Sequence, residues 1–532
     1  MRFLRLLLLT CAAGVLSPVV RAEVKLHPMF SDHMVLQQKT ETTVWGTATP
    51  NADVSVGLMQ TGGDKAVDVL LKAGADGKWV AKLPPQKAGT GYTLTAQSGG
   101  TTVTLKDVAV GEVWLCSGQS NMEWMVKQLN KDGQAKKVAD AATNKNIRLF
   151  TVPNRPSAKP EADFPVSKTE GLWLECNPEN VMNFSAVGYF FGRDIQNDLK
   201  VPVGLIASDW GGTSCQSWTS REALTANSDL KYYVEQFDTA MKGYDPAKAD
   251  ESYKAAMEKW KAAADKAKAD GKQAPTAPRK QSNPGSGPTT TTLFNGMIAP
   301  ITHYAIKGAI WYQGESNAGR AAEYYTLFPA MITDWRKQWG YDFPFFAVQL
   351  APYKGATNGP AGGLDYAELR DAQVHATKTL KHVGIAIITD AGDENDIHPQ
   401  KKEPAGDRLA LAARAVAYGE KVEYQGPTYK SMTADGGKVK VAFDHAAGLS
   451  AKGDSLNGFA VCGEDKKFYP AKATIEGENV IVTSESVAKP VAVRYGWVNF
   501  AKPELNLFNK AGLPAVPFRS DNFPLTTATT KK

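Results

Sequence analysis

The chain of 532 residues is long enough for about three domains, since ~150 residues is typical of one. Its hydrophobic fraction of 43% and charged fraction of 22% are those of a globular protein, which excludes wholesale disorder and a membrane protein. The formal net charge is only +6, and Arg2, Arg5 and Arg21 of the N-terminal segment contribute to it, so no nucleic-acid partner is indicated.

The N-terminal segment has the layout of a secretory signal peptide. A basic start at Arg2 and Arg5 precedes an apolar stretch from Leu6 to Val20, and the small residue Ala22 stands at the expected cleavage point. A membrane span needs about 20 apolar residues, and this stretch is shorter. We therefore expect residues 1–22 to be removed and the mature protein to be secreted or periplasmic, without membrane attachment.

Four cysteines lie beyond this segment, namely Cys116, Cys176, Cys215 and Cys462. Their spacing fits no zinc pattern, so no metal site is predicted from them. An oxidising compartment would permit a disulfide without requiring one.

Residues 23–108 alternate short apolar runs with turn residues, as in Thr43–Gly46, Ala52–Leu58 and Tyr92–Thr95. This spacing predicts an N-terminal β-sandwich domain. It brings together no cluster of reactive side chains, so we do not expect this domain to carry the chemistry.

From residue 109 to 421, strand patterns alternate with helix patterns, which predicts a doubly wound parallel sheet with helices on both faces. The candidate strands are Val113–Ser117, Ile147–Phe150, Val203–Ser208, Gly308–Tyr312, Phe345–Gln349 and Val383–Thr389. Helices are expected after Ser120 and around Ala186, Ala322 and Asp407. Reactive groups in such folds gather at the carboxyl ends of the strands.

Residues 245–291 interrupt this domain. The Lys/Ala/Glu-rich stretch Tyr253–Lys272 predicts an exposed helix, and the Pro-, Gly- and Thr-containing stretch after it predicts a loop. Residues 422–532 return to strand patterns at Lys438–Phe443 and Val491–Tyr495. We expect a C-terminal β-sandwich followed by an ordered tail.

The first reactive candidate is Ser120, in the segment Trp114–Met122. An apolar strand runs there into a turn and then a helix, so the hydroxyl and the backbone N–H of Ser120 would lie at a helix N-terminus, where the N–H is free to hold an oxyanion. Serine is also a common helix cap, so this segment alone does not establish catalysis.

The second candidate is His398, in a loop that follows the apolar strand Val383–Ile388. A histidine among carboxylates is suited to act as a base that a carboxylate orients. The alternative is a calcium site, because Asp393, Glu394 and Asp396 offer hard oxygen ligands.

Two further strand ends carry small and polar residues, Asp209–Ser214 and Ile310–Asn317. Glycine lets a backbone N–H approach a substrate oxygen, and an amide side chain supplies another donor. Turn geometry and capping would explain the same residues without catalysis.

The order of these four segments resembles the sialate O-acetylesterase family of SGNH-type hydrolases. The signature-like blocks are Gly118–Met122, Trp210–Thr213, Gln313–Ser316 and Asp396–Pro399. Flanking segments also match, at Phe30–Gln37, Leu293–Ile298 and Gly512–Arg519. The resemblance therefore spans nearly the whole mature chain apart from the Lys-rich insertion.

The resemblance implies that Ser120 attacks the acetyl carbonyl and that His398 is the general base. It implies that the N–H groups of Ser120 and Gly212 face the oxyanion, with Gln313 favoured over Asn317 as the side-chain donor. No metal or organic cofactor is implied.

Three carboxylates are candidates for orienting His398, since many SGNH hydrolases place an Asp three positions before the His and this chain has Asn395 there. Asp396 is the first choice, because it belongs to the Asp-Ile-His-Pro block. Glu315 and Asp393 are the alternatives.

The implied function is a secreted serine esterase that removes acetyl groups from carbohydrates. O-acetylated sialic acid is one substrate class, and acetylated polysaccharide such as xylan or xyloglucan is the alternative. A noncatalytic carbohydrate-binding protein is a different class, but binding does not need Ser120, His398 and a carboxylate together. Tryptophans near the site could stack on sugar rings or lie in the core, namely Trp124, Trp210, Trp218 and Trp311.

Overall fold

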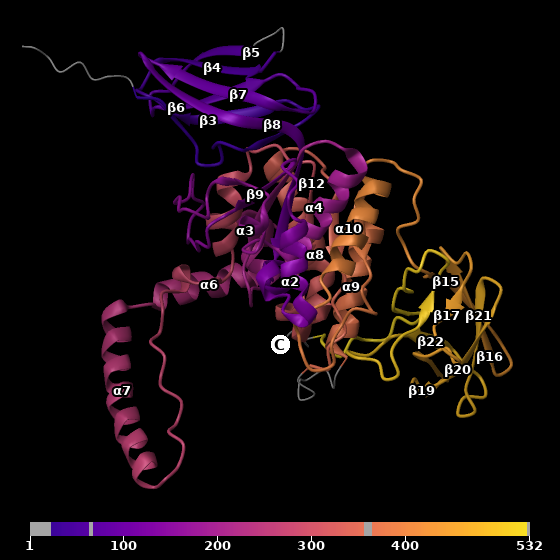
Figure 1. The fold of residues 1–532 in the computed structure, drawn as a ribbon. Coiled ribbons are helices and arrows are strands. Elements are labelled where there is room, and N and C mark those ends of the chain that lie inside the picture. Colours follow the sequence, from indigo (N-terminus) through magenta and orange to yellow (C-terminus); the bar gives the residue numbers. More distant parts are fainter. Residues whose placement is uncertain (1–22, 63–66, 356–363, 529–532) are drawn as a thin grey trace, which may run out of the picture.

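The computed structural model describes residues 23–62, 67–355 and 364–528. The expected signal segment, residues 1–22, lies outside the described residues. Figure 1 shows a central α/β region with an all-β region at each end of the chain. Within the described residues no helix is both long and apolar enough to cross a membrane.

The central sheet has the strand order β10-β9-β11-β8-β12-β13-β14. Its strands are β8 (Thr101–Gly118), β9 (Ile147–Thr151), β10 (Trp173–Glu175), β11 (Val203–Asp209), β12 (Gly308–Tyr312), β13 (Phe345–Val348) and β14 (Val383–Ala386). Every neighbouring pair is parallel except β10 with β9. All six strands predicted from the apolar runs are confirmed, and the antiparallel edge strand β10 makes the sheet mixed rather than purely parallel.

Helices cover both faces of this sheet. On one face α4 (Ala186–Leu199) packs against α10 (Glu403–Val416), and on the other α8 (Ala321–Trp339) packs against α9 (Asp365–Thr379). The Ser185 hydroxyl caps α4 by accepting a hydrogen bond from the Gly188 N–H at 3.0 Å. Both faces of the sheet are thus shielded from water, which is why its strands are continuous apolar runs.

Strand β8 is shared between the N-terminal region and the central sheet. Its first half pairs with β7 (Gly89–Ser98), and its second half lies between β11 and β12. The expected boundary between residues 108 and 109 therefore falls inside one strand. The remaining strands of this region are β1 (Lys25–Leu26), β2 (Val35–Gln37), β3 (Thr42–Thr47), β4 (Asp53–Gln60), β5 (Val67–Lys72) and β6 (Lys78–Leu83).

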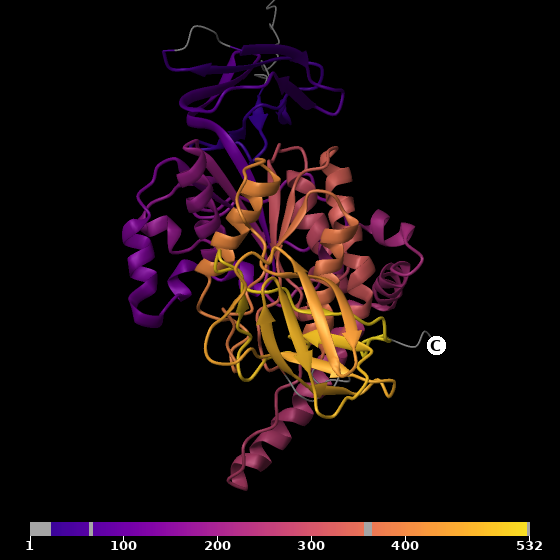
Figure 2. The same cartoon turned by 90° about the vertical axis from the view of Figure 1, so that its right-hand side faces the viewer.

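The C-terminal region has two four-stranded sheets that share one hydrophobic core, and Figure 2 shows it in front of the central region. One sheet contains β15 (Thr428–Asp435), β16 (Lys438–Asp444), β20 (Lys472–Glu476) and β21 (Asn479–Thr483). The other contains β18 (Phe459–Cys462), β19 (Phe468–Pro470), β22 (Ala492–Tyr495) and β24 (Phe518–Arg519). A smaller pair joins β17 (Ser450–Ala451) to β23 (Leu507–Phe508).

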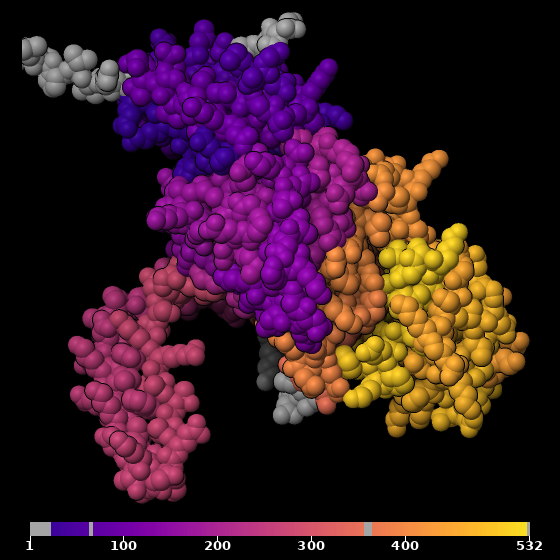
Figure 3. Space-filling view, in the orientation of Figure 1, coloured from indigo at the N-terminus to yellow at the C-terminus, as the bar shows by residue number. Residues whose placement is uncertain are grey.

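The Lys-rich insertion forms a projecting arm, defined as residues 245–283. Helix α7 (Pro246–Ala269) runs outward from α6 (Lys231–Gly243), and the chain then returns along it (Figure 1). Figure 3 shows the arm standing away from the body of the molecule. Ala249 is the one buried residue of α7, which confirms the predicted exposed helix.

The other helices are short. They are α1 (Ser120–Glu123), α2 (Gln134–Ala141), α3 (Pro178–Val181) and α5 (Arg221–Ala226), with 3-10 turns that include η7 (Glu315–Arg320). Cys116, Cys176, Cys215 and Cys462 are all buried free thiols.

Candidate active site

Ser120 lies where β8 ends and α1 begins. Gly118 has φ +140°, and a Cβ atom there would lie 2.2 Å from the Tyr312 carbonyl oxygen of the neighbouring strand β12. Only glycine permits so close an approach of the two strand ends. The Gln119 N–H then donates to the same carbonyl at 3.0 Å, which holds the turn that presents Ser120.

His398 reaches Ser120 from the loop after β14. Its Nε2 atom lies 2.8 Å from Ser120 Oγ, a hydrogen-bond distance. The Trp124 ring stacks on the imidazole with ring centroids 4.9 Å apart and an interplanar angle of 20°. The structure therefore brings together the two residues that the sequence proposed as nucleophile and base, with the imidazole held by an aromatic neighbour.

Asp396 is the carboxylate nearest to the imidazole. Its Oδ1 atom accepts the backbone N–H of His398 at 2.8 Å and lies 3.9 Å from His398 Nδ1. Asp393 instead accepts the backbone N–H groups of Asn395 and Asp396, at 3.0 and 3.2 Å. Asp393 therefore shapes the loop, whereas Asp396 is placed beside the ring.

In the part of the chain that the structure describes, no hydrogen bond or ion pair joins Glu315 to His398. The Glu315 Oε1 atom accepts a hydrogen bond from Asn121 Nδ2 at 2.6 Å, and its Oε2 atom is buried without a hydrogen-bond partner among the described residues. Burial raises the pKa of this carboxyl group. Glu315 is therefore connected to the His398 loop through the Asn121 side chain, which also donates to the Ile397 carbonyl at 3.0 Å.

The turn after β11 lies against Ser120. A Cβ atom on Gly211 would come within 3.2 Å of Ser120 Cβ, and the Gly211 N–H donates to Glu123 Oε2 at 2.7 Å. The next residue, Gly212, is exposed with φ +72°, and a Cβ atom there would meet nothing within 4 Å. Gly212 is therefore an uncrowded, exposed position next to the glycine that packs on Ser120, where the oxyanion donor was predicted.

Gln313 is not brought to the surface of the site. Its side chain is fully buried, and its Nε2 atom donates to Asn317 Oδ1 at 2.7 Å and to the Thr213 carbonyl at 3.3 Å. Asn317 is also buried, and its Oδ1 atom accepts the Cys215 N–H at 2.8 Å. These amides hold the turns after β11 and β12 together. Both hydrogens of the Gln313 amide are directed at other residues, and Asn317 Nδ2 donates to Gln216 Oε1 at 3.1 Å.

The electrostatic surroundings favour a neutral imidazole. Burial lowers the pKa of His398 below its ordinary 6.5, the Lys402 charge lowers it further, and Asp396 opposes both effects. A histidine that is neutral near pH 7 can accept the proton of a serine hydroxyl.

The acidic loop carries ion pairs that occupy its carboxylates. Glu394 lies 2.9 Å from Lys502 Nζ and 3.6 Å from Lys354 Nζ. Asp393 lies 3.9 Å from Lys131 Nζ. Lysine side chains thus already compensate the charges of Glu394 and Asp393, so the loop resembles an ion-pair network more than a calcium site.

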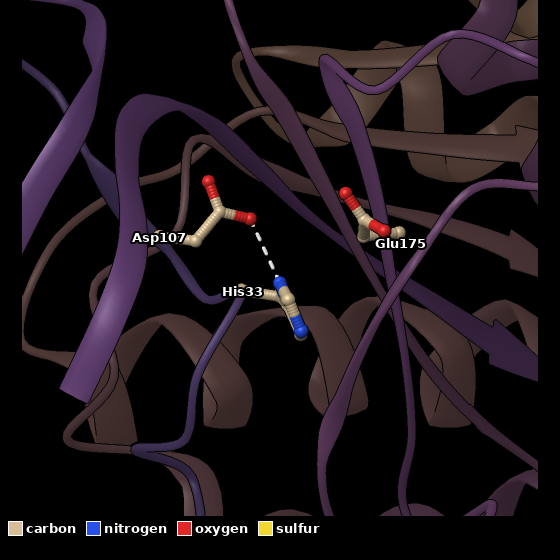
Figure 4. Close-up of side chains that lie close together, drawn as sticks. All are labelled: His33, Asp107 and Glu175. Atoms are coloured by element: carbon tan, nitrogen blue, oxygen red, sulfur yellow. Dashed lines mark hydrogen bonds and ion pairs between the residues drawn. The ribbon is translucent and has the colours of Figure 1, made fainter.

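A group that could hold a metal lies elsewhere, at His33, Asp107 and Glu175 (Figure 4). His33 Nδ1 lies 2.7 Å from Asp107 Oδ2, but Arg148 Nη2 donates to the same oxygen at 2.8 Å. The buried guanidinium already supplies the positive charge, and a cation beside it would be repelled. We therefore describe this group as an ion-pair network that joins the N-terminal region to the central sheet.

Two polar residues of the site were not selected from the sequence. Asn121 and Lys402 are both buried, and Lys402 Nζ donates to Asn121 Oδ1. Asn121 follows Ser120 in the block Gly118–Met122, so its place in the motif could have marked it as a site residue. Lys402 resembles its exposed neighbour Lys401, so only the fold distinguishes the two.

The four tryptophans named as possible sugar contacts differ in exposure. Trp218 and Trp311 are fully buried, Trp124 stacks on His398, and Trp210 is partly exposed. Trp124 and Trp210 are thus the two that keep partly exposed surface, and one face of Trp124 is covered by His398.

Comparisons with known proteins agree with this arrangement. Residues 110–271 and 281–413 match the family described as carbohydrate esterase, sialic acid-specific acetylesterase. Mouse sialate O-acetylesterase is 31% identical over 528 residues, covering 92% of each chain. Human sialate O-acetylesterase is 28% identical, covering 92% of this chain and 91% of that one.

A solved structure extends the similarity to the whole fold. A carbohydrate acetylesterase from Xanthomonas citri superimposes with a TM-score of 0.78 at 35% identity, covering 94% of this chain and 100% of that one. Fold and relatives together define a carboxylic ester hydrolase. Within that class, the chain belongs to the sialic acid-specific acetylesterase family of carbohydrate esterases.

Proposed function

We propose that this protein hydrolyses O-acetyl esters of sialic acid through an acetyl-enzyme, with Ser120 as nucleophile and His398 as general base. The observation that carries the proposal is the 2.8 Å separation of His398 Nε2 from Ser120 Oγ. A serine hydroxyl needs such a base within hydrogen-bond reach to attack a carbonyl carbon.

In the first half-reaction, Ser120 Oγ bonds to the acetyl carbon while His398 Nε2 takes the hydroxyl proton. The carbonyl oxygen becomes an oxyanion, for which the backbone N–H groups of Ser120 and Gly212 are the proposed donors. The tetrahedral intermediate then expels the sugar oxygen, which receives the proton from His398. The products are the free sugar hydroxyl and acetyl-Ser120.

In the second half-reaction, water replaces the sugar. His398 removes a proton from the water as its oxygen attacks the acetyl carbon, and it returns that proton to Ser120 Oγ as acetate leaves. Asp396 is the proposed group that stabilises the imidazolium in both halves. The Ser120 proton leaves on the sugar hydroxyl and a proton from water replaces it, so both residues return to their starting state and the cycle uses no cofactor.

The substrate assignment rests on the relatives. The mammalian relatives are named sialate O-acetylesterases, which supports O-acetylated sialic acid. The broader name of the Xanthomonas citri relative, carbohydrate acetylesterase, supports other acetylated carbohydrates, including polysaccharide, as the second candidate.

We further propose an SGNH-type catalytic domain between two β-sandwich domains. The helix-covered sheet and the two-sheet C-terminal core support this division. Export to a secreted or periplasmic location follows from the signal-like segment 1–22.

The test is Ser120→Ala with nitrophenyl acetate and a panel of O-acetylated sugars. The change removes one hydroxyl, so the variant is expected to fold with an unchanged circular dichroism spectrum and to lose turnover. Retention of more than about a hundredth of the wild-type kcat would contradict the assignment, since loss of a triad nucleophile costs far more. The panel then separates sialic acid esters from polysaccharide esters by kcat/KM.

A further inference from the structure

The side chain of Asn121, the residue after Ser120, is buried among three segments of the active site. Its Nδ2 atom lies 2.6 Å from Glu315 Oε1 and 3.0 Å from the Ile397 carbonyl oxygen. Its Oδ1 atom accepts a hydrogen bond from Lys402 Nζ. One amide therefore contacts the segments that follow β8, β12 and β14.

The Ile397 carbonyl and Lys402 determine which way this amide points. The Ile397 carbonyl only accepts and the protonated form of Lys402 only donates, so the carbonyl faces Nδ2, the ammonium faces Oδ1, and both amide hydrogens are directed at acceptors. These acceptors are the Glu315 carboxylate and the Ile397 carbonyl. The hydrogen-bonding capacity of the amide nitrogen is thus fully used, and a flipped amide would meet two acceptors with an oxygen.

Burial makes this arrangement costly to disturb. Asn121 is 0% exposed and Lys402 is 1% exposed. Burial lowers the pKa of Lys402 to about 7, against the opposing effect of Glu315, and burial likewise raises the pKa of Glu315. Each polar group compensates another, and an unpaired group at this depth carries a desolvation penalty.

The contact with Ile397 acts on the backbone of the base. The peptide unit between Ile397 and His398 has two polar atoms, and both are held. The Ile397 carbonyl accepts from Asn121, and the His398 N–H donates to Asp396 Oδ1 at 2.8 Å. This peptide unit sets the direction in which the imidazole leaves the loop toward Ser120.

We propose that Asn121, held by Lys402 and Glu315, is a positioning residue that keeps His398 aligned with Ser120. The inference rests on the proposed roles of Ser120 and His398 and adds the element that joins them. Because Asn121 is buried, it acts through the base and not on the substrate.

The first test removes the Ile397 contact while keeping the others. In Asn121→Asp combined with Glu315→Gln, the new carboxylate can accept from the new amide and from Lys402, but the Ile397 carbonyl loses its donor. The reference is Glu315→Gln alone, which shares any effect of losing the Glu315 charge. The double variant is expected to show kcat for nitrophenyl acetate about tenfold to a hundredfold below the single variant, with KM within about twofold. Equal kcat values in the two variants would overturn the proposal.

The second test uses Lys402→Met, with the exposed neighbour Lys401→Met as matched control. Lys402 and Asp396 are the charged groups that act on His398. Removing the cation takes away one of the two effects that lower the pKa of His398 and leaves burial as the other, so the acid limb of the kcat/KM profile should move upward by about half a pH unit or more, and the control should not move. A limb that stays in place in Lys402→Met would overturn the role of Lys402, and this readout remains if the double variant fails to fold.

Ser120→Ala separates this inference from the proposed function. Full turnover by Ser120→Ala would reject the proposed function itself. An inactive Ser120→Ala, together with a double variant as active as its reference, would reject the positioning role of Asn121 alone.

Discussion

Three glycines let backbone segments approach one another around the proposed nucleophile. A Cβ atom on Gly118 would lie 2.2 Å from the Tyr312 oxygen, and one on Gly314 would lie 2.3 Å from a Leu369 methyl carbon. Gly211 permits the turn after β11 to rest against Ser120. A side chain at Gly118 would separate the ends of β8 and β12, and side chains at Gly211 and Gly314 would collide with Ser120 and Leu369.

The choice of orienting carboxylate can be tested residue by residue. Asp396→Asn keeps size but removes the charge beside His398 Nδ1, so kcat for nitrophenyl acetate should fall by ~10³ or more with little change in KM. Asp393→Asn should matter far less, because Asp393 accepts loop N–H groups and not the imidazole.

If Glu315 is the orienting carboxylate instead, the kcat losses of the two amide variants should be in the opposite order. If Asp396→Asn stayed within about tenfold of wild type while Glu315→Gln fell by ~10³ or more, Glu315 would be the orienting carboxylate.

The pH dependence of activity follows from the surroundings of His398. Its neutral form accepts the Ser120 proton, so kcat/KM falls as pH drops through the pKa of His398. Burial and Lys402 lower that pKa below the ordinary value of 6.5. The acid limb for nitrophenyl acetate is therefore expected below pH 6.5. A limb above that value would mean that the imidazolium is stabilised, contrary to this environment.

At the scale of elements, the apolar runs predicted the central strands well because parallel strands are buried on both faces. Strand β12 has the predicted bounds Gly308–Tyr312, and the Ser120 and His398 segments both follow strands of this sheet. The sequence predicted that these two segments would meet at one edge of the sheet, because the carboxyl ends of parallel strands lie together and because both segments carry family-like motifs.

Helix α9 was missed because its buried face is polar. It buries Glu368, Arg370 and Gln373 next to apolar residues such as Leu369, so its buried positions do not follow the apolar periodicity of an ordinary helix. These groups bind backbone atoms and distant residues, such as the Leu350 carbonyl that accepts from Arg370 Nε at 2.8 Å. The sequence did not predict the burial of Gln313 and Lys402 for the same reason, since the groups that hydrogen-bond to these side chains lie far away in the sequence.

The projecting arm should be dispensable for folding. None of residues 250–290 is buried, and Trp260 bonds within the arm, donating to the Pro275 carbonyl at 2.7 Å. Replacing residues 250–280 with a short Gly/Ser linker is expected to leave the melting temperature within about 3 °C of the full chain. Turnover of nitrophenyl acetate should also be retained.

The matched control for the arm is a single substitution within it, Trp260→Ala, which should likewise leave melting and turnover unchanged. A melting temperature lowered by about 10 °C or more in the linker variant would show that the arm supports the core.

At the scale of the whole molecule, the N-terminal region is continuous with the central sheet. One hydrophobic core extends from Val24 to Trp311, and β8 runs from the N-terminal sheet to the residue before Gln119. The Trp173 indole also donates to the Met29 carbonyl at 3.0 Å. The similarity to the Xanthomonas citri acetylesterase covers 94% of this chain, so the flanking regions are part of the shared architecture.

The central claim is that Ser120, activated by His398, forms the covalent intermediate. The most direct measurement is incubation with a serine-directed fluorophosphonate, followed by mass spectrometry of the proteolysed protein. We expect one adduct per chain on the peptide that contains Ser120, no adduct in Ser120→Ala, and much slower labelling in His398→Ala. A stoichiometric adduct on another residue, with Ser120 unmodified and activity lost, would contradict the account.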